Sequence, residues 1–266
     1  SLRLWSELRP DYVKIDRHFI DGIHQDAVKR EFVGSILKMA KASRAQVIAE
    51  GIELPEELVG DEYASFLCMS NWKCNYQYAI DNVMDPMHGA YLHATSHSMA
   101  EGDKQADMRV RKTETGLMFE KVGQRDVNFD WVELGETGTL WMRLAIPYKK
   151  KFGPGGNFGI IGFAVPVDEN NCQVYFWRTR KVSGWQRDAW RFMYRNRLEG
   201  LHWAVLEQDR YVLESMAPNA REHEFLYQHD VGMTRVRRMF RQRAQQHFAE
   251  LDAYRAQTAQ AGAAQT

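Results

Sequence analysis

The stretch FGIIGFAVPVDENNCQVYFWRTRKV, residues 158–182, contains two runs of apolar and aromatic residues on either side of the polar segment DENN. Runs of this composition, bounded by Asp and Asn, predict β-strands over 158–167 and 172–182. The connection between them is too short to hold the helix that a parallel crossover requires. The stretch therefore predicts two strands that pair antiparallel.

Three further runs of the same kind precede this pair and predict strands, over 116–123, 127–134 and 139–148. Apolar residues then recur at helical spacing from about 185 to 216 and again from about 231 to 256. Successive antiparallel strands closed by helices indicate an α+β domain with a cavity between the sheet and the helices.

The N-terminal region has a different pattern. DYVKID (11–16) and QVIAEGI (46–52) predict short strands, and the residues between them predict a helix over about 26–43. A βαβ unit belongs in a parallel sheet covered by helices, and about forty residues cannot bury both faces of such a sheet alone. We expect a βαβ unit over residues 1–53, a larger domain over 54–256 and a disordered tail over 257–266.

The composition is that of a packed protein of 266 residues, with 44% hydrophobic residues and equal numbers of acidic and basic side chains. The balanced charge gives no overall field that would attract nucleic acid or a membrane. Three cysteines without a CxxC pair argue against a disulfide framework or a zinc finger. We therefore expect a cytoplasmic protein. The absence of a starting Met suggests that the sequence begins within a longer one.

The segment DNVMDPMHGAYLH (81–93) contains the residues typical of a redox metal site, Asp85, His88 and His93. Non-haem iron sites that activate oxygen use two neutral imidazoles and one carboxylate. Asp85 and His88 are spaced to share one helix face, whereas His93 is about 140° away from His88 on an ideal helix. We expect Gly89 to let the helix loosen or end between the two histidines.

Asp209 is the obvious third ligand. It lies in HWAVLEQDRYVLE (202–214), whose apolar residues predict a buried helix face, and an unpaired buried carboxylate is costly. Asp85 would then hydrogen-bond the free ring nitrogen of a ligand histidine. On spacing alone, the alternative that Asp85, His88 and His93 are unrelated polar residues stays open.

The run NWKCNYQYAIDNVMDPMHGAYLHA (71–94) resembles the mononuclear-iron segment of the Rieske-type aromatic-ring-hydroxylating oxygenases, in the catalytic domain of the alpha subunit. The similarity extends over residues 54–250. The resemblance implies Fe(II) ligands at His88, His93 and Asp209, with catalytic roles for Asn82 and for Asp85, which would link the iron to an incoming electron.

The same resemblance implies a fold and a function. The fold would be of the helix-grip (Bet v1/START-like) type, an antiparallel sheet wrapped around a helix. The function would be that of an oxidoreductase in aromatic catabolism, a monooxygenase or dioxygenase that hydroxylates or demethylates a small aromatic substrate. Electrons would come from a reductase or ferredoxin, and the assembly would be a homotrimer.

The family's Rieske [2Fe–2S] cluster has no ligands in this sequence. The family holds it with a CxH and a CxxH pair, and none of the three cysteines is followed by histidine at those spacings. We expect the iron site to lack its normal electron source, so that the chain would be inactive alone.

PDYVKIDRHFI (10–20) and VIAEGIE (47–53) resemble the later part of an EAL domain, the TIM-type barrel of cyclic di-GMP phosphodiesterases. Lys14 and Glu50 match active-site positions of that family, but the EAL signature and the paired aspartates are absent. We expect the remnant of an active site without hydrolytic activity. Two alternatives to the oxygenase remain, a degenerate EAL-type signalling protein and a fusion or truncation product without function.

Overall fold

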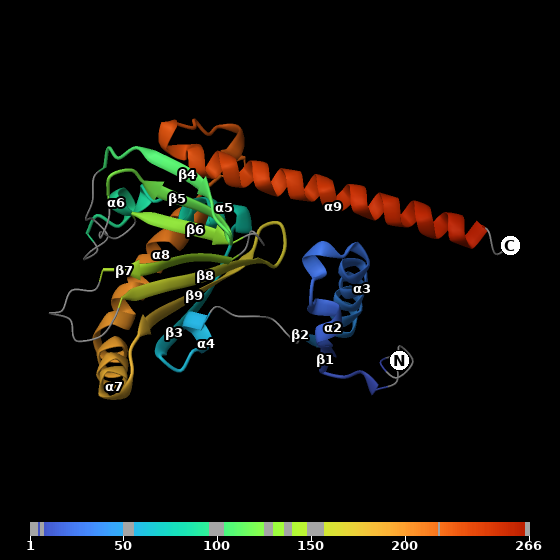
Figure 1. Ribbon diagram of the computed structural model, residues 1–266, viewed down its shortest axis with the longest axis horizontal. Coiled ribbons are helices and arrows are strands. Elements are labelled where there is room, and N and C mark those ends of the chain that lie inside the picture. Colours follow the sequence, from blue (N-terminus) through green and yellow to red (C-terminus); the bar gives the residue numbers. More distant parts are fainter. Residues whose placement is uncertain are drawn as a thin grey trace. The chain divides into compact units, whose positions relative to one another are not determined.

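The computed structural model describes residues 5, 8–49, 56–95, 104–124, 130–135, 140–147, 157–217 and 219–263. The chain divides into two compact units (Figure 1). The first contains Ser1–Leu54 and Phe240–Thr266, and the second contains Pro55–Met239. The division near residue 54 falls next to the boundary expected from the sequence.

The first unit contains the predicted βαβ arrangement. Strands β1 (Tyr12–Ile15) and β2 (Gln46–Ala49) pair in parallel, and three helical segments connect them, α2 (Arg17–Ile20), η1 (Ile23–Gln25) and α3 (Ala27–Ser43). Asp26 caps α3, since its Oδ1 accepts hydrogen bonds from the backbone N–H groups of Val28 at 2.9 Å and Lys29 at 3.0 Å. The helix ends at Arg44, which has a positive φ of 61°.

The long C-terminal helix α9 (Val231–Ala263) begins in the second unit and continues into the first. Within the first unit, Arg30 on α3 donates to His247 Nδ1 at 3.0 Å and pairs with Glu250. The backbone of α9 is helical as far as Ala263, within the segment 257–266 that was expected to be a disordered tail. Alanine and glutamine are frequent in this segment, and both have high helix propensity.

The described part of the second unit contains one seven-stranded antiparallel sheet in the order β3-β9-β8-β7-β6-β5-β4 (Figure 1). The strands are β3 (Tyr63–Trp72), β4 (Met108–Lys112), β5 (Gly116–Lys121), β6 (Trp131–Gly135), β7 (Leu140–Ile146), β8 (Phe158–Pro166) and β9 (Cys172–Lys181). The hairpin of β8 and β9 pairs Phe158 with Arg180 and Pro166 with Cys172. All five strands predicted from the sequence are present, although residues 125–129, 136–139 and 148 lie outside the described residues.

The two edge strands, β3 and β4, were not predicted. β3 pairs along its whole length with β9, which lies more than a hundred residues further along the chain. Its buried and exposed residues alternate over much of its length. Strand prediction depends on β-branched and aromatic residues, and β3 contains few of them, because positions such as 65, 70 and 71 are Ser, Ser and Asn.

Among the described residues of the second unit, one short helix precedes β3, two short helices lie between β3 and β4, and further helices follow β9. The helices are α4 (Glu56–Val59), α5 (Tyr76–Val83), α6 (His88–Leu92), α7 (Gly184–Met193), the π-helical turn η4 (Tyr194–Leu198), α8 (Glu199–Glu214), η5 (Ala220–Glu222) and η6 (Gln228–Asp230). The helical region predicted over 185–216 is thus α7, η4 and α8 in sequence. The α+β class, with helices packed on an antiparallel sheet, is confirmed. In the described part of the chain, no helix is long and apolar enough to cross a bilayer.

An aromatic cluster marks the face of the sheet that packs against the helices. Phe66 on β3 stacks on Tyr194 of η4, with ring centroids 4.1 Å apart and planes within 5°. Trp190 of α7 contacts the edges of Phe66 and Phe158. The side chains that share this face with Phe66 therefore point toward the helices, and we call it the inner face of the sheet.

Candidate metal centre

A break between two short helices positions the histidines. Helix α5 ends at Val83 and α6 begins at His88. Between them, Asp85 Oδ1 accepts a hydrogen bond from Met87 N at 2.7 Å. The expectation that Asp85 and His88 share one helix, which loosens at Gly89, is wrong. A proline disfavours helical backbone at the residue before it, which is Asp85 here. Pro86 therefore places the helix break before His88.

The two histidines and Asp209 converge, although α8 contributes the acid from more than a hundred residues away. His93 Nε2 lies 3.2 Å and His88 Nε2 lies 3.7 Å from Asp209 Oδ1. The imidazole rings are 5.2 Å apart at an angle of 78°. One nitrogen or oxygen of each residue lies within 4.8 Å of the others, and the group is almost completely buried.

The far nitrogens of both rings are held by acceptors. His93 Nδ1 lies 2.8 Å from Gln208 Oε1, and His88 Nδ1 is hydrogen-bonded to the backbone carbonyl of Asp85. Because these oxygens only accept, each Nδ1 carries the proton in the neutral ring. Each Nε2 then directs a lone pair toward Asp209. Two lone pairs and a carboxylate that face one another can hold a cation between them.

In the metal-free protein a proton can take that place. Burial alone would lower the pKa of His93, but the Asp209 carboxylate and Gln208 outweigh it and raise the pKa above its ordinary value of 6.5. Burial also raises the pKa of the Asp85 carboxyl, and His88 and the Met87 N–H oppose this change only in part.

Asn82 and Gln208 complete the polar surroundings. Asn82 Nδ2 donates to Asp209 Oδ1 at 3.1 Å, which holds the carboxylate near the imidazoles. Asp85 differs from the expectation, because its backbone carbonyl and not its carboxylate bonds the His88 ring. Gln208 could not be predicted as a site residue, because only its position beside Asp209 distinguishes it from other glutamines.

The donor set fits a divalent iron ion. Two imidazole nitrogens and one carboxylate oxygen form the three-residue set of non-haem iron sites, which leaves coordination positions open. The orientation of both rings by hydrogen bonds at Nδ1 is also typical of metal-binding histidines.

The other predicted site lies in the first unit. Lys14 is exposed on β1, where it pairs in register with Ile48 of β2. Glu50 lies outside the described residues, so a remnant of an EAL active site stays a prediction.

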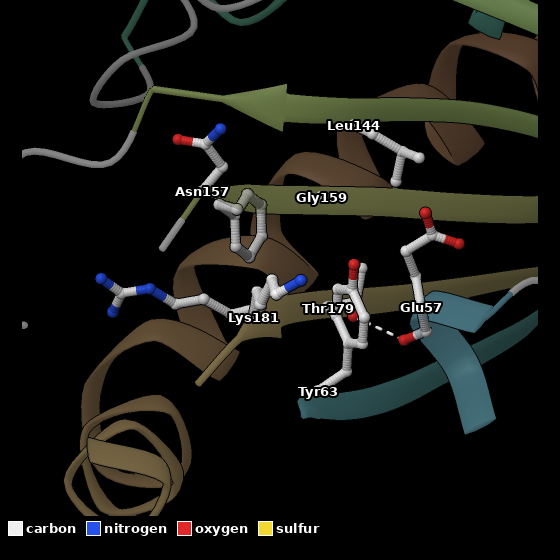
Figure 2. A pocket seen from close by; sticks show the side chains of 9 residues that line it. Glu57, Tyr63, Leu144, Asn157, Gly159, Thr179 and Lys181 are labelled. Carbon is white, nitrogen blue, oxygen red and sulfur yellow. Dashed lines mark hydrogen bonds between the residues drawn. The ribbon is translucent and has the colours of Figure 1, made fainter. Parts of the chain in front are cut away.

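A separate hollow of about 400 Å³ lies beside β3, β8 and β9, and none of its lining residues belongs to the metal centre. Figure 2 shows Tyr63, Thr179 and Lys181 at this hollow, with Thr179 Oγ1 donating to the backbone carbonyl of Glu57 at 2.7 Å.

Residues 72–246 match the family described as the vanillate O-demethylase oxygenase C-terminal domain. The chain belongs to this family. Residues 1–59 match the EAL domain. Both resemblances found in the sequence, to a Rieske-type oxygenase catalytic domain and to an EAL fragment, are thus confirmed.

Solved structures with the same fold include dicamba monooxygenase bound to dicamba, which is 16% identical, with a TM-score of 0.52 over 75% of this chain. A fluorene-bound oxygenase and ferredoxin complex of carbazole 1,9a-dioxygenase is 14% identical, with a TM-score of 0.53 over 72% of this chain. This chain covers 64% and 60% of those two chains.

A cyclic di-GMP phosphodiesterase, TpdA of Vibrio parahaemolyticus serotype O3:K6 (strain RIMD 2210633), is 40% identical over 53 residues. These residues make up 20% of this chain and 9% of that protein. The likeness is therefore limited to a small part of the phosphodiesterase.

Proposed function

We propose that the second unit is the oxygen-activating catalytic domain of a Rieske-type oxygenase, which hydroxylates or demethylates a small aromatic substrate. The observation that carries this proposal is the convergence of His88, His93 and Asp209 in a chain of this family. When bound, Fe(II) would supply the binding and activation of O₂.

The surrounding residues have distinct roles in this proposal. His88 and His93 bind the metal through Nε2, and Asp209 binds it through its carboxylate. Asn82 keeps that carboxylate in place by donating to Oδ1. Gln208 and the Asp85 carbonyl keep the proton of each ring on Nδ1, so that both Nε2 lone pairs stay available to the metal.

Asp85 is proposed to connect the centre to its electron donor. Its carboxyl is partly buried beside His88, and this burial raises its pKa, so that it can hold a proton. The sequence contains no CxH or CxxH pair for a [2Fe–2S] cluster, so the electrons would come from a reductase or ferredoxin. We also propose that the protein is a cytoplasmic homotrimer. The chain alone should have negligible NADH-driven activity.

The proposal is tested by nitric oxide, a probe of open coordination positions on ferrous iron. Protein loaded anaerobically with Fe(II) and exposed to nitric oxide should give the electron paramagnetic resonance signal of a high-spin iron nitrosyl. His93→Ala should lose the signal, and His223→Ala, which changes an exposed histidine, should keep it. A wild-type protein without the signal would reject an oxygen-activating iron site.

The alternative of EAL-type signalling is tested separately. The match to the EAL domain covers residues 1–59 only, and the paired aspartates of that family are missing. We expect no hydrolysis of cyclic di-GMP. Micromolar binding of this nucleotide, together with absence of iron uptake, would favour signalling over oxygenation.

A further inference from the structure

Cys74 and Cys172 form a buried pair of free thiols in the second unit. Cys172 begins β9, where it pairs in register with Trp72, the last residue of β3. The chain continues for two residues beyond Trp72 to Cys74, whose Sγ lies 4.0 Å from that of Cys172 in a hydrogen bond. Because the two strands end together, thiols that are 98 positions apart in the sequence are in direct contact.

Hydrogen bonds hold the segment between β3 and α5, which carries the first of these thiols. Lys73 N donates to Glu214 Oε1 at 2.9 Å, at the end of α8. Asn75 Nδ2 donates to the backbone carbonyl of Glu169 at 2.9 Å, in the turn between β8 and β9. The segment is therefore fixed next to the start of β9 by bonds that involve neither sulfur atom.

The two thiols of the pair are chemically unequal. The hydrogen bond with Cys172 lowers the pKa of the Cys74 thiol, although burial and Glu214 oppose this change. The same hydrogen bond and burial raise the pKa of Cys172. Cys74 is also the more accessible of the two, at 6% exposed against 1%. Since the thiolate is the nucleophilic form, Cys74 is the sulfur that reacts first, and Cys172 keeps its proton.

The third cysteine of the chain shows the contrast. Cys68 on β3 is buried, and its Sγ lies 4.0 Å from the hydroxyl group of Tyr194 and not from another sulfur. Burial raises the pKa of its thiol. A cysteine in such surroundings behaves as a small apolar side chain and resists oxidation. Cys68 is therefore an internal reference for the reactivity of the pair.

We propose that Cys74 and Cys172 are a redox modification site, at which hydrogen peroxide forms a reversible disulfide. The disulfide joins the segment before α5 to the start of β9, and it closes a loop that contains both His88 and His93. The inference does not rest on the proposed function, because neither thiol belongs to the metal centre and the reaction needs no iron.

Hydrogen peroxide is the oxidant in this reaction, and it is reduced to two molecules of water. The Cys74 thiolate attacks one peroxide oxygen, so that an S–O bond forms and the O–O bond breaks. The hydroxide that leaves takes up the proton that Cys74 had lost. The Cys172 sulfur then attacks the sulfenic sulfur of Cys74, so that the S–S bond forms and the S–O bond breaks. The hydroxyl group leaves as water with the proton of Cys172.

Peptide mapping of the full chain tests the disulfide directly. The reduced wild type, freed of metal with EDTA, is treated with a slight excess of hydrogen peroxide, and the remaining thiols are blocked with N-ethylmaleimide. Cleavage by trypsin at Lys73 separates the three cysteines, which lie in peptides 45–73, 74–104 and 152–178. Mass spectrometry should find 74–104 joined to 152–178 and peptide 45–73 blocked, and dithiothreitol should reverse the link.

Three serine variants test the assigned order of reaction. Cys172→Ser should stop at a sulfenic acid on Cys74, which dimedone labels, because the second thiol is missing. Cys74→Ser should form no disulfide and should keep Cys172 reduced. Cys68→Ser is the matched control and should form the disulfide as the wild type does.

Thermal unfolding measures whether the native fold accommodates the bond. Oxidation should raise the Tm of the wild type and of Cys68→Ser by roughly 5–15 °C, because the disulfide closes a long loop. The same treatment should leave the Tm of Cys74→Ser unchanged. A lower Tm of the oxidised wild type would show that the bond distorts the fold, and it would overturn the inference.

Three results of the peptide mapping would also overturn it. The first is survival of all three thiols in the native wild type under conditions that oxidise them in urea. The second is a main product that involves Cys68 or links two chains. The third is a sulfinic acid at Cys74 without an S–S bond. These results are read on the wild type, so the test stands even if a serine variant does not fold.

Discussion

Gln208 fixes the ring of His93 through a single hydrogen bond between its Oε1 and Nδ1. If this bond keeps Nε2 available to a metal, Gln208→Leu should lower Fe(II) affinity about 10- to 100-fold, as is usual when such a partner is removed. Anaerobic Fe(II) titration measures the effect, with the exposed Gln242→Leu as control. Unchanged affinity in Gln208→Leu would show that the ring is oriented by packing alone.

The raised pKa of His93 predicts how metal binding depends on pH. A pKa above 6.5 means that the folded, metal-free protein holds this proton to a higher pH than the unfolded chain does. The proton stabilises the metal-free fold at low pH, and this contribution is lost as the pH rises through the folded pKa. Fe(II) must displace the proton, so affinity should fall about tenfold per pH unit below that pKa.

Anaerobic titrations between about pH 6 and pH 8 measure this dependence. An affinity that stays constant across the range would contradict the assignment of His93 as a proton-bearing ligand.

The sequence predicted which side chains meet at the centre, but not all of their contacts. Histidine and aspartate are residue types that bind iron. The sequence alone therefore indicates that His88, His93 and Asp209 can be metal ligands. The partner of His88 is a backbone carbonyl of Asp85, and every residue carries such a group. A hydrogen bond to a backbone carbonyl therefore cannot be predicted from the type of residue that carries it.

At the scale of the elements, the sheet depends on a close approach between β7 and β8. A Cβ added at Gly162 would lie 2.3 Å from atoms of the Trp141 ring, which is buried. Gly162→Ala should therefore destabilise the fold by about 1–3 kcal/mol, as overpacked cores do. Urea unfolding measures the change.

Gly200→Ala is the matched control for this substitution. A Cβ at Gly200 meets no atom within 4 Å, and the residue lies in the helix α8. Alanine should stabilise the fold by about 0.5–1 kcal/mol, because it has the higher helix propensity. If both variants lose the same stability, the contact with Trp141 is not the cause.

The elements themselves were predictable where local signals are strong. The runs that became β7, β8 and β9 contain several β-branched and aromatic residues, and turn residues bound them. The helix break was predicted at Gly89 and lies before His88. The spacing of Asp85 and His88 favoured one helix, whereas Pro86 disfavours helical backbone at Asp85. β3 was missed because its identity as a strand depends on pairing with the distant β9.

At the scale of the whole molecule, the two units differ in how well they bury their apolar residues. In the first unit, Val28, Phe32, Leu37 and Ile48 are each 46% to 49% exposed. A two-stranded sheet offers too little surface to cover them. We expect limited trypsin digestion of the full chain to remove the N-terminal segment well before it cuts the seven-stranded sheet.

Mass spectrometry of the digestion products would identify the order of cleavage. Digestion in the presence of EDTA and of Fe(II) serves as a control, since metal binding should protect the second unit only. Early cleavage within the seven-stranded sheet, with the N-terminal segment intact, would contradict the expected order of stability.

The central claim is tested most directly by the number of ferrous ions that the protein binds. Anaerobic equilibrium dialysis followed by metal analysis should find one Fe(II) per chain in the wild type, none in His88→Ala or Asp209→Ala, and one in the exposed control His223→Ala. Absence of tight Fe(II) binding in the wild type, or iron that persists in both ligand variants, would contradict the account.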